Sequence, residues 1–203
     1  RRPTVIRSGG LSLRVIDRGG RLALRVKDSA APERLGFRGL DYFPVDSASR
    51  VRARLVPHVR PHSLKVTNIL GQPEEYPSPG ILSFRLNGRR FELIAAQQPG
   101  DSALFIIFRD STSLTETYQA ARFLSAPPPD RDGNTILDFN RAYNPPCAFT
   151  AFSTCPLPPP ENVLATAIRA GEKRYAGALG YLPSSVAAAD GAPSAGGSPG
   201  RAR

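Results

Sequence analysis

The sequence predicts an all-β protein, an antiparallel β-barrel or β-sandwich built from hairpins. Short segments with strand character recur at a spacing of about eight to twelve residues, which is typical of such folds. Two pairs of these segments are joined by tight-turn dipeptides, Gly19-Gly20 and Asn87-Gly88. Almost no segment has the apolar period of a helix, so we expect little helix.

Two hairpins carry the clearest strand signals. Residues 11–28 alternate apolar and polar side chains on both sides of the glycine pair 19–20, which can adopt the positive φ of a tight turn. Residues 81–86 form the first strand of the second hairpin, and Asn87-Gly88 is a typical type I′ turn before the return strand.

Four further segments are expected to be strands. Arginine alternates with apolar residues over 50–56, the pattern of a strand with one face in water. Residues 63–70 predict a short strand, the continuously apolar run 103–108 predicts a strand covered on both faces, and residues 135–140 predict a late strand. Residues 114–124 are ambiguous, because Ala and Gln favour helix whereas Thr, Tyr and Phe favour strand.

The chain divides into three expected regions. Residues 1–10 are an N-terminal extension, residues 11–181 are a single β-rich domain, and residues 182–203 are a disordered tail rich in Ala, Gly, Pro and Ser. The sequence contains no methionine, so we expect a processed chain or a fragment of a longer product.

The net charge of +10 raises the question of a nucleic-acid partner. The basic residues are spread along the predicted strands, and no basic run is interleaved with aromatic residues, so no nucleic-acid partner is expected. No apolar run approaches the roughly 18 residues of a membrane span. We therefore expect a soluble, cytoplasmic protein without a membrane partner, and the sequence leaves its oligomeric state undefined.

One stretch, DFNRAYNPPCAFTAFSTCPLPPPEN at 138–162, concentrates rigid and polar residues. It holds both cysteines of the chain and six of its 21 prolines. Each proline fixes its own φ, so such a segment loses little conformational entropy when a ligand binds. The stretch is therefore the first place to look for a binding site.

Four segments of the chain carry a family resemblance. The pattern D-F-N-R-x-Y-N-P-P-C…C-P-L-P-P-P-E-N at 138–162 is specific, and IRAGEKRY follows it at 168–175. FRDSTSLTETYQAARFL at 108–124, and RLALRVKD followed by FRGLDYFPVD at 37–46, match as well. Together they resemble the bacterial family called domain of unknown function 1684. The chain begins after the usual N-terminal portion of that family, so we expect part of the fold to be missing. The family has no established activity, so the resemblance implies a relative and no function.

The preferred hypothesis is a β-domain that binds a small polar ligand, anionic or sugar-like, through the polar residues of 138–173 and without a cofactor. If residues 114–124 form a strand, Glu116, Tyr118 and Arg122 share one face, and Arg122 would meet Asp138 or Glu172. The expected ligand-binding residues are Glu116, Tyr118, Arg122, Asp138, Asn140, Arg141, Tyr143, Asn144, Asn162, Glu172 and Lys173.

Two other interpretations compete with ligand binding. The same polar side chains could instead satisfy buried main-chain groups of a long irregular segment, in a structural or interaction protein. The protein could also be an enzyme of unassigned class, for example a hydrolase, with Asp138 or Glu172 as the acid or base. No catalytic motif of a known class occurs in the sequence.

Cys147 and Cys155 allow four interpretations. A catalytic thiol needs a nearby base, and neither His58 nor His62 lies close in sequence, so we do not favour it. The spacing of the two cysteines is wider than that of typical zinc ligands, and His58 and His62 do not converge on them easily, so we expect no metal. A disulfide would close a loop of about nine residues, but only in an oxidising compartment or in a redox-active pair. The favoured interpretation is two buried, reduced thiols that pack in the loop.

Overall fold

The computed structural model describes residues 4–18, 20–97 and 100–177. The chain divides into two compact units, Arg1–Gly39 and Leu40–Arg203. This division differs from the expected one, because the first predicted hairpin belongs to the first unit and all later strands belong to the second. The expected tail lies outside the described residues.

The first unit is a three-stranded antiparallel sheet in the order β1-β2-β3, followed by one helical turn. Its elements are β1 (Val5–Ser8), β2 (Leu11–Arg18), β3 (Arg21–Asp28) and α1 (Pro32–Leu35). β2 and β3 are the predicted hairpin, and Gly20 has the positive φ, 80°, that its turn requires. No sequence signal predicted β1, which lies in the segment expected to be an extension.

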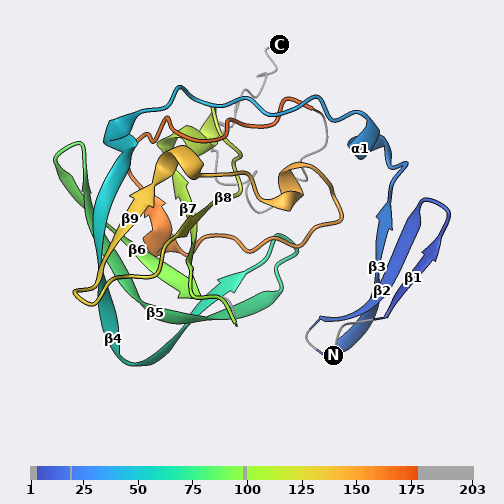
Figure 1. The fold of residues 1–203 in the computed structure, drawn as a ribbon, viewed down its shortest axis with the longest axis horizontal. Coiled ribbons are helices and arrows are strands. Elements are labelled where there is room, and N and C mark those ends of the chain that lie inside the picture. The colour runs from blue at the N-terminus through green and yellow to red at the C-terminus, as the bar shows by residue number, and fades with distance from the viewer. Residues whose placement is uncertain (1–3, 19, 98–99, 178–203) are drawn as a thin grey trace, which may run out of the picture. The chain divides into compact units, whose positions relative to one another are not determined.

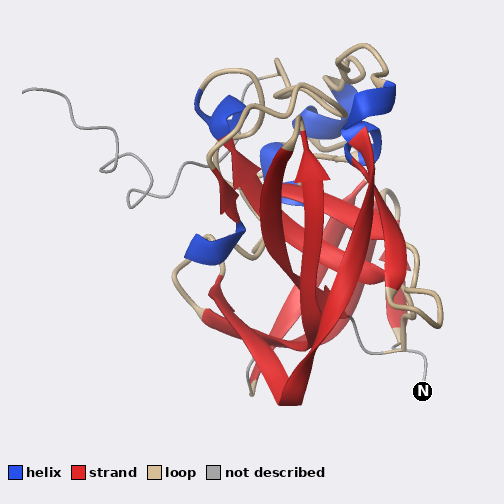
Figure 2. Cartoon of the chain, turned by 90° about the vertical axis from the view of Figure 1, so that its left-hand side faces the viewer, coloured by secondary structure: helices blue, strands red, loops and turns tan. Residues whose placement is uncertain are grey.

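The second unit is one seven-stranded sheet in the order β10-β7-β6-β5-β4-β9, with β8 also paired to β7. All pairs are antiparallel except that of β10 with β7. The sheet curls into a half-barrel (Figures 1 and 2), which confirms the predicted all-β class. Its strands are β4 (Arg50–Thr67), β5 (Pro73–Leu86), β6 (Arg89–Gln97), β7 (Leu104–Asp110), β8 (Arg122–Ala126), β9 (Asn134–Asp138) and β10 (Val163–Leu164).

β4 is a single strand of 18 residues, where the sequence predicted separate strands at 50–56 and 63–70. The register between β4 and β5 shifts between Pro57 and His62, so a bulge bends the strand without ending it. Gly80 lies opposite Pro57, and a side-chain carbon at this position would collide with the main chain of β4. The bulge therefore requires glycine at position 80.

β7 lies between two hydrophobic clusters, as its continuously apolar sequence predicted. Leu104, Ile106 and Phe108 pack into the first cluster, which fills the half-barrel. Phe105 and Ile107 pack into the second cluster, on the opposite face of the strand. The β5–β6 turn is also as predicted, since both of its central residues have positive φ.

Short 3₁₀-helices connect the strands near the polar segments. They are η1 (Ser47–Ser49), η2 (Ser111–Leu114), η3 (Phe139–Arg141), η4 (Pro146–Ala148) and η5 (Pro160–Asn162). The ambiguous segment 114–124 is neither a helix nor one strand, because η2 ends at Leu114, an irregular stretch follows, and β8 begins at Arg122. In the described part of the chain, no helix is long and apolar enough to cross a membrane.

Candidate functional site

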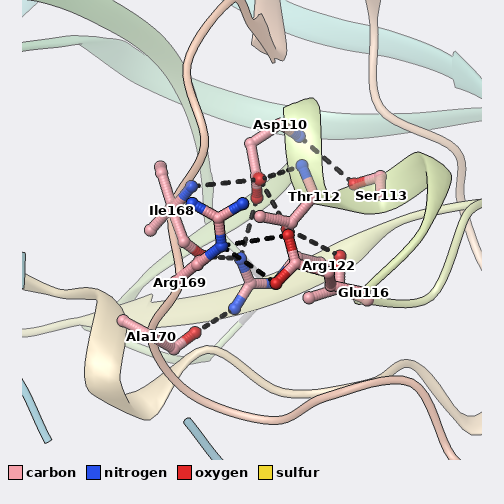
Figure 3. Close-up of polar contacts among 9 residues, drawn as sticks. Asp110, Thr112, Ser113, Glu116, Arg122, Ile168, Arg169 and Ala170 are labelled. Atoms are coloured by element: carbon pink, nitrogen blue, oxygen red, sulfur yellow. Dashed lines mark hydrogen bonds and ion pairs between the residues drawn. The ribbon is translucent and has the colours of Figure 1, made fainter. Parts of the chain in front are cut away.

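Arg122 forms a buried ion pair with Asp110 (Figure 3). Its Nη1 donates to Asp110 Oδ2 over 2.7 Å, and the two side chains are 1% and 0% exposed. Arg122 was expected to meet Asp138 or Glu172, but its direct ion-pair partner is Asp110, and Glu172 acts on it only through a smaller charge interaction that raises its pKa. β8 pairs with β7, which ends at Asp110, whereas β9, which ends at Asp138, pairs with β4.

The rest of the Arg122 guanidinium binds main-chain oxygens of a distant segment (Figure 3). Nη1 donates to Ile168 O over 2.9 Å and Nη2 donates to Ala170 O, while the group lies over the Phe108 ring. Burial lowers the pKa of Arg122, and the neighbouring Asp110 opposes this shift. The guanidinium therefore ties segment 168–170 to the sheet. Among the described residues its Nε has no hydrogen-bond partner, so one buried donor is unsatisfied.

Both carboxylate oxygens of Asp110 accept hydrogen bonds inside the fold. Its Oδ1 accepts from the amide and the hydroxyl of Thr112, at 2.8 and 2.6 Å, and from Ile168 N at 3.3 Å. Ser113 completes a capping box by accepting from the Asp110 amide over 3.2 Å. The carboxylate therefore starts η2, pairs with Arg122 and holds the return segment, which is a structural role.

Glu116 and Tyr118 do not share a strand face with Arg122, because both lie in the irregular stretch before β8. Glu116 forms a surface ion pair with Arg169, with Nε 2.9 Å from Oε2 (Figure 3). Tyr118 is buried in the second cluster, where its hydroxyl donates to Cys147 O over 3.3 Å. Burial raises the pKa of Tyr118.

Asn162 fills a gap in the sheet where β6 and β7 separate. The two strands pair only at their near ends, Ala96 with Phe105 and Gln97 with Leu104. Asn162 Oδ1 accepts from Ile94 N over 2.7 Å, and Nδ2 donates to Ile94 O and Ile107 O. This fully buried amide thus replaces a missing peptide group between the strands.

Asn144 and Glu172 join the polar block to the C-terminal segment. The main-chain amide of Asn144 donates to Glu172 Oε2 over 2.7 Å, and the side-chain Nδ2 of Asn144 donates to Lys173 O over 2.8 Å. Glu172 also accepts from the Tyr42 hydroxyl at 3.4 Å, and the Lys173 ammonium lies 5.2 Å from the Phe43 ring centre. Glu172 and Lys173 remain half-exposed.

Asn140 binds the loop before β4, and Asp138 contacts Asn140 and the first residue of β4. Asn140 exchanges two hydrogen bonds with the main chain of Asp46, at 2.8 and 2.9 Å. Asp138 accepts from the main-chain and side-chain nitrogens of Asn140, and its Oδ2 lies 4.0 Å from Arg50 Nε.

Tyr143 and Arg141 differ in exposure although they are close in sequence. Tyr143 exchanges two main-chain hydrogen bonds with Phe123, both of 2.9 Å, and burial raises the pKa of its half-buried phenol. Arg141 is exposed at the end of η3. Most polar side chains of the block are therefore occupied inside the fold, and the assignment of a ligand site to them stays a prediction.

A groove of about 890 Å³ lies elsewhere, on the β4–β5 part of the sheet. No sequence motif indicated this groove, although the alternating arginines of β4 predicted an exposed basic face. It is lined by Val51, Arg52, Ala53, Arg54, Leu55, Val56, Pro57, Ser83, Phe84, Arg85, Arg90 and Asn134.

Strand register brings the arginines of this groove onto one face. Arg54 lies opposite Ser83 on β5 and opposite Asn134 on β9, and Arg85 lies opposite Arg90 on β6. Their neighbours along each strand point into the first hydrophobic cluster, so the arginines project from the outer face of the half-barrel. We call this surface the arginine groove, defined by Arg52, Arg54, Arg85 and Arg90.

The sequence model of the family described as "Protein of unknown function (DUF1684)" matches residues 35–173. The chain belongs to this family. The solution NMR structure of an uncharacterized protein of Haloarcula marismortui is similar, with 38% identity and a TM-score of 0.58, over 70% of this chain and 80% of that one. No curated protein matches.

Within this DUF1684 domain, the residues of the pattern at 138–162 mainly make contacts that hold the fold together. Its asparagines at 144 and 162 bind main-chain groups, as described above. The arginine groove also lies within the matched residues, but none of its arginines belongs to the pattern. The described residues contain no group of three or more His, Cys, Asp or Glu side chains that could hold a metal ion.

Proposed function

We propose that this DUF1684 domain binds a small anionic ligand and that the arginine groove holds it. The observation that carries the proposal is that four arginines line one groove of the sheet. Arginine donors form a planar fork that fits carboxylate and phosphate oxygens in pairs. A groove of about 890 Å³ has room for a small organic anion.

The charge balance of the groove favours an anion. Arg90 pairs with Glu92 over 3.0 Å, and Arg85 uses one donor on Gly88 O. Within the described residues, Arg52 and Arg54 make no hydrogen bond or ion pair through their side chains. They lie two residues apart on one strand face, roughly 7 Å along the strand, so both can reach one ligand.

The polar block of 138–173 supports a ligand less well. Asn144 and Asn162 of the block, and Arg122 outside it, donate to main-chain oxygens, which leaves few of the expected donors free for a ligand. Arg141, Arg169 and Lys173 are the cations of the block that reach solvent, and Arg169 is already paired with Glu116. Three expectations stay predictions: a ligand at the block, a hydrolase reaction at Asp138 or Glu172, and a cytoplasmic location.

The test is a titration of the ¹⁵N-labelled chain with citrate, inorganic phosphate and glucose, followed by NMR. We expect saturable shifts of β4 and β5 amides with citrate or phosphate, none with glucose, and weaker binding at higher salt because the groove is open to water. The variant Arg52→Ala/Arg54→Ala should weaken binding by at least about tenfold, the equivalent of roughly 1.4 kcal/mol.

The matched control is Arg141→Ala/Lys173→Ala, which removes the same charge from the polar block. This control should bind as the unmodified chain does. If it loses binding while the groove variant keeps it, the ligand lies at the block and the proposal fails. If neither anion gives saturable shifts, binding of a small carboxylate or phosphate is excluded as well.

A further inference from the structure

Cys147 and Cys155 lie side by side beneath an exposed loop. Cys147 is the central residue of η4, and Cys155 precedes Pro156, where the chain returns to β4. The two residues are 1% and 5% exposed and belong to the second hydrophobic cluster. Neither forms a disulfide, and no other cysteine exists in the chain.

The Cys155 sulfur lies against the main chain of Cys147. The Cys147 main-chain amide donates to Cys155 Sγ over 3.1 Å. Main-chain bonds hold both ends of the intervening loop, from Ala148 N to Pro145 O and from Ile69 N to Cys155 O. A disulfide between these positions therefore needs only a small shift of the side chains.

The middle of the loop leaves a route for a small oxidant. In the described part of the chain, the main chain of 150–154 makes no hydrogen bond to another main-chain group. Phe152, at the tip, is 85% exposed. Loosely held segments of this kind open at low free energy, so the sulfur atoms are transiently accessible although they are buried on average.

We propose that Cys147 and Cys155 are a peroxide-reactive dithiol that closes reversibly to a disulfide. Cys147 sulfur attacks one oxygen of a hydroperoxide and becomes a sulfenic acid. The O–O bond breaks, and the thiol proton of Cys147 leaves with the alcohol, or with water when the oxidant is hydrogen peroxide. Cys155 sulfur then attacks the Cys147 sulfur, forms the S–S bond and expels the sulfenic oxygen as water.

The surroundings assign different roles to the two thiols. The hydrogen bond from the Cys155 thiol, with a contribution from the Tyr118 hydroxyl, lowers the pKa of Cys147. The same thiol–thiol contact and burial raise the pKa of Cys155. Since the thiolate is the reactive form and the Tyr118 hydroxyl lies 3.3 Å from the main-chain oxygen of Cys147, we assign Cys147 as the attacking residue and Cys155 as the resolving one. A small thiol such as glutathione reverses the bond by exchange, which suits a reducing compartment.

The test uses the full chain, reduced, freed of reductant and exposed to hydrogen peroxide. After denaturation with N-ethylmaleimide, intact mass should show two adducts before exposure, none after it, and two again after dithiothreitol. Thermal unfolding of the oxidised chain should shift upward by about a few degrees, because the bond closes a loop of about nine residues. Persistence of both adducts in the folded, peroxide-treated chain would overturn the proposal, as would a disulfide-linked dimer.

Single variants test the assigned roles. Cys155→Ser should accumulate a sulfenic acid that dimedone traps, at a rate at least about tenfold above that of Cys147→Ser. Equal trapping rates in the two variants would refute the assignment of Cys147 as the attacking thiol. The mass measurement on the unmodified chain decides the proposal even if a variant fails to fold.

Discussion

Arg122 Nη1 and Asp110 Oδ2 lie 2.7 Å apart in a pair that water hardly reaches, where the first residue of β8 meets the last residue of β7. The same guanidinium also holds two carbonyl groups of segment 168–170. One side chain thus joins two strands to a segment more than 40 residues away along the chain. Such a network is costly to break, because each remaining group stays buried without its partner.

Arg122→Met should destabilise the fold by about 3–5 kcal/mol, because Asp110 would keep a buried charge without its cation. Denaturant titration with circular dichroism measures this loss. The control is Arg169→Ala, which breaks the exposed pair with Glu116 and should cost under about 1 kcal/mol. Equal losses in the two variants would mean that the buried pair has no special structural role.

The sequence indicated the strands but not this pair. Hairpin turns and apolar runs are local signals, so Asn87-Gly88 and the strand β7 were predictable. The partner of Arg122 was not, because η2 and an irregular stretch separate it from Asp110, and only the pairing of β8 with β7 brings them together.

Two further features depended on neighbours across the sheet. β4 looked like two strands because Pro57 and Pro61 interrupt its pattern, but proline is tolerated at the bulge. The alternating arginines of β4 predicted an exposed face. Their gathering with Arg85 and Arg90 depends on register, which no single segment reveals.

Asn162→Ala should destabilise the fold by at least about 1–3 kcal/mol, because three main-chain groups of β6 and β7 lose their partner. Hydrogen exchange gives the specific signature, since the Ile94 amide should lose protection more than amides of the β5–β6 turn. Unchanged protection of Ile94 would contradict the bridging role of the side chain.

Asn144→Ala and Arg141→Ala should differ in their effect on the free energy of unfolding, although the two residues are close in sequence. Asn144 is buried and donates to Lys173 O, so its loss should cost about 1–3 kcal/mol. Arg141 is exposed, so its replacement should stay within about 0.5 kcal/mol. Denaturant midpoints of the two variants check this, and a larger loss for Arg141→Ala would show a contact that the fold does not explain.

His58 lies at the bulge of β4, with Nε2 3.0 Å from Ser78 Oγ and its ring 4.5 Å from that of His62. Burial, and to a lesser extent the charge of His62, lowers the pKa of His58. The unfolded chain therefore takes up this proton at a higher pH, near the ordinary value of about 6.5, than the folded chain does. Acidification below that value stabilises the unfolded state, whereas at higher pH the shift has no effect.

The free energy of unfolding should thus fall between pH 7.5 and pH 5.5 by more in the unmodified chain than in His58→Gln. All other titrating groups are common to the two proteins, so the difference between their pH profiles isolates His58. His62→Gln should give an intermediate profile, because it removes the smaller of the two causes of the shift. Denaturant titrations at several pH values measure the three curves. Parallel curves for the unmodified chain and His58→Gln would show that His58 titrates alike in the folded and unfolded states.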